Sequence, residues 1–431
     1  MPKATNDTTT PAEIKRNFRL FVINGVIYIF GEALLDPTLV LVAFISQLTD
    51  SAFLIGMLVP LRDAAWALPQ LWISNFIQRQ PLKIQFYKKI TYIRILTWLA
   101  ITLTIFLVKD PAILLVLFFI SFGISSLANG LAGLPFLELV SKTIPPDRRG
   151  ELFAWRLGLG GMFGIGGSVL VRWLISSKNP FIFPHNFGML SLIFLITGST
   201  ALLLLNLIHE TPDLVSPPKR SIQKQIKVAW GELSSNNNFR SAIISYALLL
   251  FSGAAVPFFA VFVQQELGGS REWVGIYLAV MMAANLISNV VFGRISSHRN
   301  NQTVFTIAAW SGVAMSAGVL ILSLLAKPLG IGPQTASILL LPAYFLAGVR
   351  ITGIGVSGNS LLLNIAPPEE RTSIIGFSQS FLGLVLLATG LNGVIVTRFG
   401  FPILVGLTLL THTVAVIMTK RIIDVRGTNP G

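Results

Sequence analysis

Two stretches of the sequence, IPPDRRGELFAWR at residues 144–156 and APPEERTSIIGFS at residues 366–378, have the same order of features. Each places Pro-Pro, an acidic residue and an arginine between two long apolar runs, and the second begins 222 residues after the first. One such match would carry little weight, because these residues are common in turns. A second pair of segments, NFRLFVINGVIYIFGEALLDP from Asn17 and NFRSAIISYALLLFSGAAVP from Asn238, matches at nearly the same offset. The chain is therefore predicted to contain two copies of one unit.

The composition indicates the class of protein. Of 431 residues, 53% are hydrophobic and only 12% are charged, and the mean hydropathy is +0.73. Soluble domains carry roughly 25% charged residues. Many apolar runs here reach the ~17–25 residues that cross a bilayer. We therefore predict an all-α polytopic membrane protein.

Apolar runs and polar breaks predict twelve transmembrane helices in two six-helix pseudo-repeated bundles. We expect bundles at 1–207 and 240–431 and a cytoplasmic connector at 208–239. In the connector, Ile222, Ile226, Trp230 and Leu233 recur at helical spacing, which predicts either an amphipathic helix on the inner membrane surface or an ordinary linker with some helicity. The predicted spans are 19–46, 52–78, 89–108, 112–141, 151–176, 187–207, 240–265, 273–293, 303–326, 335–365, 372–397 and 401–419.

Charge placement predicts the orientation. The net charge is +14, and most Lys and Arg residues fall in short loops on one side of the predicted spans, which places both termini in the cytoplasm. This distribution differs from the basic groove of a nucleic-acid-binding protein. The absence of cysteine excludes disulfides and thiolate chemistry. The first apolar run is too long for a cleaved signal peptide, so we expect it to be retained.

The predicted plan resembles the major facilitator superfamily over essentially the whole chain. Twelve spans in two parallel halves, a long cytoplasmic connector and repeated hinges after the fourth and tenth spans match that family. Its usual loop after the second span has Gly, three residues, Asp and a basic cluster, whereas this chain has Ser74 and Gln78 at the Gly and Asp positions. In the counterpart loop after the eighth span, Ser297 replaces the acid. The resemblance implies the fold and transport by alternating access, and it implies no subfamily or substrate.

Ionisable residues within spans cost ~2.5–3.5 kcal/mol or more each, so those present are expected to face a cavity or a partner. Glu32 and Asp36 are four residues apart and share one helix face. Two acids so placed repel when both are ionised, which favours a proton on at least one of them. We therefore take Glu32, Asp36 and Asp63 as candidates for proton coupling. Asp36 precedes Pro37, and the alternative is that it caps a helix break.

Three further residues of the second span are candidates for contact with a solute. Arg62, Trp66 and Gln70 share a face, whereas the neighbouring side chains of Arg62 and Asp63 are predicted to point about 100° apart. The alternative is an ion pair between helices, formed by Arg62 or Asp63 with an acid of the first span.

Arg350 lies in a predicted span of the second half that contains no carboxylate, and an unpaired guanidinium there is costly. The family plan implies that spans 1, 4, 7 and 10 line the central cavity. We therefore predict that Arg350 faces Glu32 or Asp36 across that cavity, or that it binds an anionic group of the substrate. Asn289 is a further candidate for the cavity wall.

Arg94 and Arg156 lie near the cytoplasmic ends of their predicted spans, where a long side chain can reach the headgroups. We expect structural roles for both, with Glu138 paired to Arg156 or Arg149. The segment GLGGMFGIGGSVL at residues 158–170 places glycines every three or four positions, which lets helices approach closely.

No catalytic triad, metal cluster or nucleotide motif is present, so we expect no enzyme activity, cofactor or metal. The expected function is secondary active transport, with proton-coupled export of small, partly apolar organic solutes. Proton-coupled import and a non-transporting sensor or assembly factor are the alternatives. We expect a monomer in the bacterial inner membrane, with a small-molecule substrate, protons and lipid as its partners and no nucleic acid.

Overall fold

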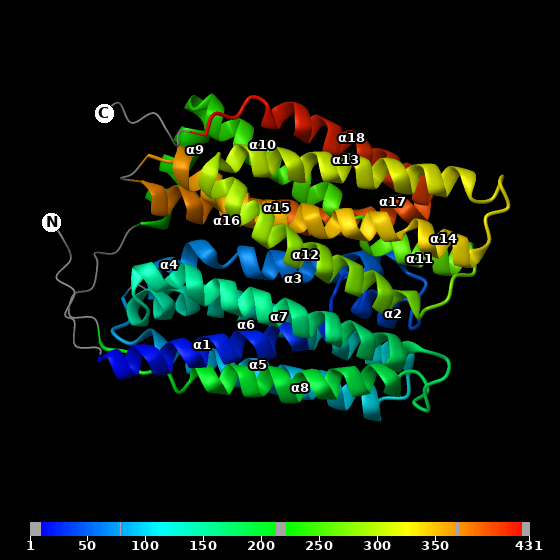
Figure 1. Cartoon of the computed structure of the whole chain (residues 1–431), viewed down its shortest axis with the longest axis horizontal. Helices are drawn as coiled ribbons and strands as arrows, with labels where there is room; N and C mark the ends of the chain where they lie inside the picture. The colour runs from blue at the N-terminus through cyan, green and yellow to red at the C-terminus, as the bar shows by residue number, and fades with distance from the viewer. Residues whose placement is uncertain (1–9, 78, 213–220, 368–369, 425–431) are drawn as a thin grey trace.

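The computed structural model describes residues 10–77, 79–212, 221–367 and 370–424, in which the chain is helical and forms no strand (Figure 1). We call the end of the molecule at which α1 begins and α18 ends the near end, and the opposite end the far end. The helices are α1 (Pro11–Leu34), α2 (Val40–Ile45), α3 (Ala52–Ala67), α4 (Gln70–Ile77), α5 (Lys83–Leu107), α6 (Pro111–Thr143), α7 (Pro146–Ile175), α8 (His185–Leu205), α9 (Ile222–Ser235), α10 (Asn237–Gly253), α11 (Pro257–Glu266), α12 (Trp273–His298), α13 (Asn301–Leu325), α14 (Pro333–Leu339), α15 (Leu341–Ile365), α16 (Arg371–Ala388), the 3₁₀ helix η1 (Thr389–Leu391), α17 (Asn392–Phe399) and α18 (Phe401–Thr419).

The predicted all-helical membrane fold is confirmed. Eleven segments within the described residues are long and apolar enough to cross a membrane. The one predicted span outside this set is the second, 52–78, which is divided at Leu68 and Pro69 into α3 and α4, because Pro69 has no amide hydrogen with which to continue the helix. The first and seventh spans are also interrupted, before Val40 and before Pro257.

The helices pack as two groups (Figure 1). In the first, α1 packs on α7 and α8, and α5 packs on α6 and α8. In the second, α15 packs on α12 and α13, and α18 packs on α10 and α13. The groups meet mainly where α7 packs on α12 and where α3 packs on α16.

The Gly-rich helix α7 permits the close packing expected from its sequence. A Cβ atom added at Gly160 would lie 2.7 Å from Ile29 of α1, and one added at Gly164 would lie 2.9 Å from Met282 of α12. A larger residue at either position would push α7 away from one of its neighbours.

The repeated hinges make the same contact in both halves. Arg149 donates from Nε to the carbonyl of Ile144 at 3.0 Å, and Arg371 donates from Nε to the carbonyl of Ala366 at 3.3 Å. In both cases the arginine satisfies a carbonyl left free where the preceding helix ends. Residues 368–369 of the second hinge lie outside the described residues. The repeated arginine therefore has a structural reason.

The repeated asparagines also have matching partners. The Asn17 amide donates to the His209 carbonyl at 3.1 Å, and the Asn238 amide donates to the Ile423 carbonyl at 2.8 Å. Each asparagine thus ties the start of its half to the residue that follows the last helix of that half. The next residue in each case, Glu210 or Asp424, is an acid that accepts from a backbone amide at the start of α5 or α13.

The hydrophobic cores differ between the two ends of the molecule. One core cluster includes buried residues of both halves, among them Phe44 of α2 and Phe259 of α11 at the far end. Two further clusters contain residues of a single half each, one around Phe21 and the other around Phe239. The halves therefore share a core toward the far end and have separate cores at the near end.

The connector forms the helix α9, which packs against α16 and α10. Ala229 is buried in this contact, whereas Ile226 and Trp230 of the predicted apolar stripe are exposed. Trp230 makes an edge contact with Phe377 of α16. The helix therefore docks on the second half with part of its apolar side uncovered.

Candidate functional site

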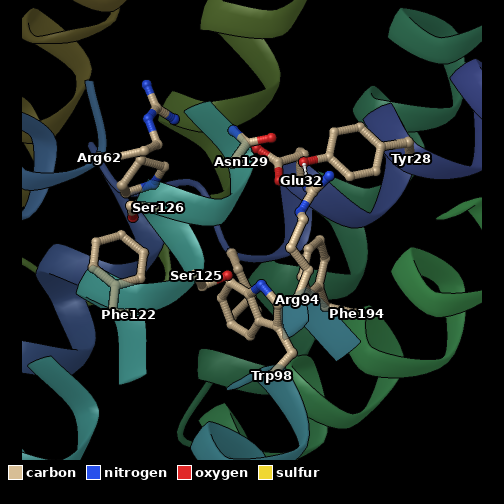
Figure 2. Close-up of a pocket in the computed structure, with 12 residues that line it drawn as sticks. Tyr28, Glu32, Arg62, Arg94, Trp98, Phe122, Ser125, Ser126, Asn129 and Phe194 are labelled. Carbon is tan, nitrogen blue, oxygen red and sulfur yellow. Dashed lines mark hydrogen bonds between the residues drawn. The ribbon is translucent and has the colours of Figure 1, made fainter. Parts of the chain in front are cut away.

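A pocket in the first half is built from α1, the α1–α2 break, α3, α5, α6 and α8 (Figure 2). It contains two arginines, one carboxylate and several uncharged polar groups within an aromatic wall. Its lining residues are Tyr28, Glu32, Leu35, Pro37, Arg62, Arg94, Trp98, Phe122, Ser125, Ser126, Asn129 and Phe194. A second pocket adjoins it through Tyr28, Arg94, Trp98 and Phe194.

Arg94 and Glu32 meet at the Tyr28 hydroxyl. Arg94 is 5% exposed, and its Nη2 donates to the Tyr28 hydroxyl at 2.5 Å. Glu32 lies one turn after Tyr28 on α1, next to the same hydroxyl and the guanidinium (Figure 2). A half-buried carboxyl is thus held beside a cation and a phenol, all within the predicted membrane spans.

Asp36 caps the break after α1. Its Oδ1 accepts from the amides of Thr38 at 3.0 Å and Leu39 at 2.9 Å. These are amides that no helical carbonyl can reach after Pro37. Asp36 is absent from the pocket lining, so the structure supports the capping alternative for this residue.

The candidate residues of the second span do not lie as the sequence predicted. Arg62 and Asp63 form an ion pair at 2.7 Å, so the prediction that their side chains diverge is wrong. The Gln70 amide donates to the carbonyl of Trp66 at 2.8 Å across the break that Pro69 makes. Gln70 is buried there and does not line the pocket. Of the three predicted solute contacts, only Arg62 reaches the pocket.

Arg350 lies in the core of the second half. It is 5% exposed, and its Nη1 donates to the carbonyl of Leu249 at 2.8 Å. No ion pair joins it to an acid among the residues that the structure describes, so the predicted pairing with Glu32 or Asp36 is not made in this conformation. Its Nε is buried without a partner among the described residues.

Asn289 is also outside the pocket. Its amide donates to the carbonyl of Asn285 in its own helix at 2.9 Å. The first half alone therefore supplies the polar pocket, and Asn289 and Arg350 remain candidates only for another conformation.

Two further predictions are wrong, one on the position of Arg94 and one on the partner of Glu138. Arg94 does not reach toward the headgroups, because it is buried in the pocket. Arg156 donates to the carbonyl of Phe21 and to the Asn24 side chain, so Glu138 is not its partner. Arg149 likewise bonds the carbonyls of Ile144 and Ser141.

Sequence reasoning missed the residues that surround Glu32. Tyr28 and Glu32 share a face of α1, Arg94 and Trp98 share a face of α5, and each pair is four residues apart. A polar residue with an aromatic neighbour at this spacing inside an apolar helix is the signal that could have identified them.

The fold and the pocket define a polytopic membrane transporter. The chain matches the Major Facilitator Superfamily over residues 21–390, and it belongs to that family. No curated protein is detectably similar to the chain in sequence.

Solved structures share the fold at low sequence identity. The nucleoside transporter NupG is 12% identical, with a TM-score of 0.72 over 94% of this chain and 99% of that one. The D-xylose-proton symporter is 14% identical, with a TM-score of 0.72 over 96% and 99%.

A bacterial homologue of the iron transporter ferroportin has been solved in two states. Its inward-facing state gives a TM-score of 0.66 at 14% identity, and its outward-facing state gives 0.58 at 16% identity, each over 94% of this chain and 98% of that one. The TM-score is thus higher for the inward-facing state than for the outward-facing state.

Proposed function

We propose that the protein is a proton-coupled secondary transporter of small, partly apolar organic solutes that works by alternating access. Glu32 is the group that takes up and releases the proton. The observation that carries this proposal is the position of Glu32, which lines a pocket beside Arg94 and Tyr28 at membrane depth. There a proton on Glu32 changes the charge that a bound solute meets.

The proposal gives the ends of the molecule distinct roles. The near end faces the cytoplasm of a bacterium, because both termini and most loop arginines and lysines lie there in the predicted topology. The two helix groups, residues 1–207 and 240–431, rock about the pocket.

Export in exchange for protons is the direction expected from the Gly-rich α7 and the apolar character of the spans. Uptake together with protons is the second candidate, and the position of Glu32 in the same pocket as Arg94, where the two charges act on each other, favours it. When Glu32 takes a proton, Arg94 is left free to bind an anionic group.

The test uses the full chain in lipid vesicles that contain a pH-sensitive dye. A transported compound from a panel is expected to move protons, in the opposite direction to the solute for export and in the same direction for uptake. Glu32→Gln should abolish the proton signal, whereas Glu138→Gln, which changes an acid outside the pocket, should keep it. A full proton signal in Glu32→Gln would contradict the coupling role, and a folded protein that moves no compound would favour the sensor or assembly alternative.

A further inference from the structure

The pocket holds several polar groups that have no hydrogen-bond partner among the residues that the structure describes. Ser125, Ser126 and Asn129 lie on the pocket side of α6, and both serines are 4% exposed. None of the three side chains makes a hydrogen bond to another described residue. The Arg94 Nε is also buried without an acceptor. Buried polar groups are rarely left unpaired, so this set indicates a bound molecule or ordered water.

The charges that face the pocket favour an anion. Two guanidinium groups and one carboxylate line it. Asp63 is committed to Arg62 at 2.7 Å, and the Asp36 carboxylate is committed to two backbone amides. The remaining cation, Arg94, forms no ion pair with an acid among the described residues, and Glu32 is the pocket carboxylate whose charge acts on it.

The other titratable groups near Arg94 do not change this balance. They are the phenols of Tyr28 on α1 and Tyr87 on α5, which are neutral at ordinary pH. The pocket-lining residues of α6 and α8 carry no charge. Protonation of Glu32 therefore leaves Arg94 as a buried cation that needs an acceptor.

The pocket also offers aromatic surfaces. The rings of Trp98 and Phe194 lie 4.4 Å apart between centroids, and those of Trp98 and Phe122 lie 6.5 Å apart, both edge to face. The exposed faces of such rings pack well against a flat apolar group. A ligand with one anionic end and one planar apolar end matches both parts of the lining.

We propose that this pocket binds a small planar organic anion whose carboxylate pairs with Arg94 and takes over from Glu32 the role of its counter-charge. Ser125, Ser126 and Asn129 donate to the same carboxylate. The inference rests on the proposed coupling role of Glu32, because the anion and the proton on Glu32 bind together. Solute and proton then move in the same direction without net charge, which selects uptake over export.

Binding to the purified full chain tests the ligand class. The probes are benzoate, its neutral counterpart benzamide and the cation benzylammonium, measured by calorimetry in two buffers of different ionisation enthalpy. Benzoate is expected to bind roughly tenfold or more tightly than benzamide, because a charge-assisted bond to Arg94 is lost in the amide. Benzoate binding should take up a proton in the wild type. Stronger binding of benzylammonium, equal binding of benzamide, or no benzoate binding at millimolar concentration would overturn the proposal.

Variants assign the effect to the pocket. Arg94→Gln should lose benzoate binding, and Arg94→Lys should restore part of it. Arg398→Gln, a matched change of an exposed arginine in the last turn of α17, should bind like the wild type. Glu32→Gln should bind benzoate without proton uptake. Benzoate binding by Arg94→Gln at wild-type affinity would refute the anion site.

The two proposals fail separately. Selection of benzylammonium with loss of proton movement in Glu32→Gln would reject the anion site and keep proton coupling. Benzoate binding that depends on Arg94, with full proton movement in Glu32→Gln, would keep the anion site and reject proton coupling through Glu32.

Discussion

Glu32, Asp36 and Asp63 are carboxylates of the first two spans, and the structure gives each a different set of partners. Asp63 pairs with Arg62, Asp36 accepts two amides, and Glu32 lies beside Arg94 and Tyr28 in the pocket. Of the three, only Glu32 lines the pocket. The same side-chain chemistry is therefore expected to give three different phenotypes on substitution.

Asp36 provides the first test of this distinction. Asp36→Asn keeps the oxygen that accepts from Thr38 and Leu39, so transport is expected to remain near the wild-type level. Asp36→Ala removes the cap and should lower the free energy of unfolding by about 1 kcal/mol. Thermal unfolding in detergent and vesicle transport measure the two effects. Loss of proton coupling in a folded Asp36→Asn variant would show that the charge itself is needed.

Arg350 provides a second test at the residue scale. Its buried guanidinium has one carbonyl acceptor and no paired acid among the described residues. Because an unpaired buried charge costs more than one hydrogen bond returns, Arg350→Met is expected to raise the free energy of unfolding, by about 1 kcal/mol. The matched change Arg156→Met should lower it, since Arg156 has two acceptors and the Phe136 ring. A lower unfolding temperature for Arg350→Met than for the wild type would contradict the assignment.

Arg94 shows why the pocket was only partly predictable. The span was predicted from residue 89, but α5 begins at Lys83, which puts Arg94 roughly 16 Å along the helix from its first residue. Sequence patterns locate helices well and their ends poorly. They also do not fix the rotation of α5 and α6 about their axes, which decides that Arg94, Ser125 and Asn129 face Glu32.

At the scale of helices, the spans and the repeat were predictable because their signals are local. Apolar runs identify the helices, and the repeated Asn and Arg make repeated contacts with the backbone. The break after Asp36 was predictable from Pro37. The separation of α3 from α4 was not predicted, although Pro69 marks it.

The contacts of Glu210 with Lys83, Ile84 and Lys142, which we call the Glu210 clamp, yield a prediction at this scale. Its side chain is fully buried and accepts from the amides of Lys83 at 3.0 Å and Ile84 at 2.8 Å and from Lys142 Nζ at 2.6 Å. It thus joins the chain after α8 to the start of α5 and the end of α6. Glu210→Gln removes the buried carboxylate that accepts from two amides and pairs with Lys142, and it should lower the free energy of unfolding by about 2–4 kcal/mol.

The exposed pair of Glu151 and Arg148 supplies the control for the clamp. Its atoms lie 3.2 Å apart, and the Glu151 side chain is 48% exposed. Glu151→Gln should therefore change stability by less than about 1 kcal/mol. Equal unfolding temperatures for the Glu210 and Glu151 variants in detergent would show that the clamp contributes nothing.

At the scale of the whole molecule, the two halves are joined at the far end. The start of α12 presses on the end of α7, where a Cβ atom at Gly275 would lie 2.6 Å from the Arg172 backbone nitrogen. Arg271 donates to the Gln47 side chain at 2.8 Å across the halves. Alternating access requires these contacts to separate in each cycle.

A cross-link at the far end tests that requirement. The chain contains no cysteine, so Gln47→Cys with Arg271→Cys introduces the only two thiols. A short reducible thiol cross-linker should join them in the conformation described here, because the native side chains already touch. Transport should then stop, since the far end can no longer open, and reduction should restore it. Each single-cysteine variant treated with the same reagent should keep its activity. Full transport by the cross-linked protein would mean that the far end stays closed during the cycle, and rocking of the two halves would then be the wrong description of how this chain works.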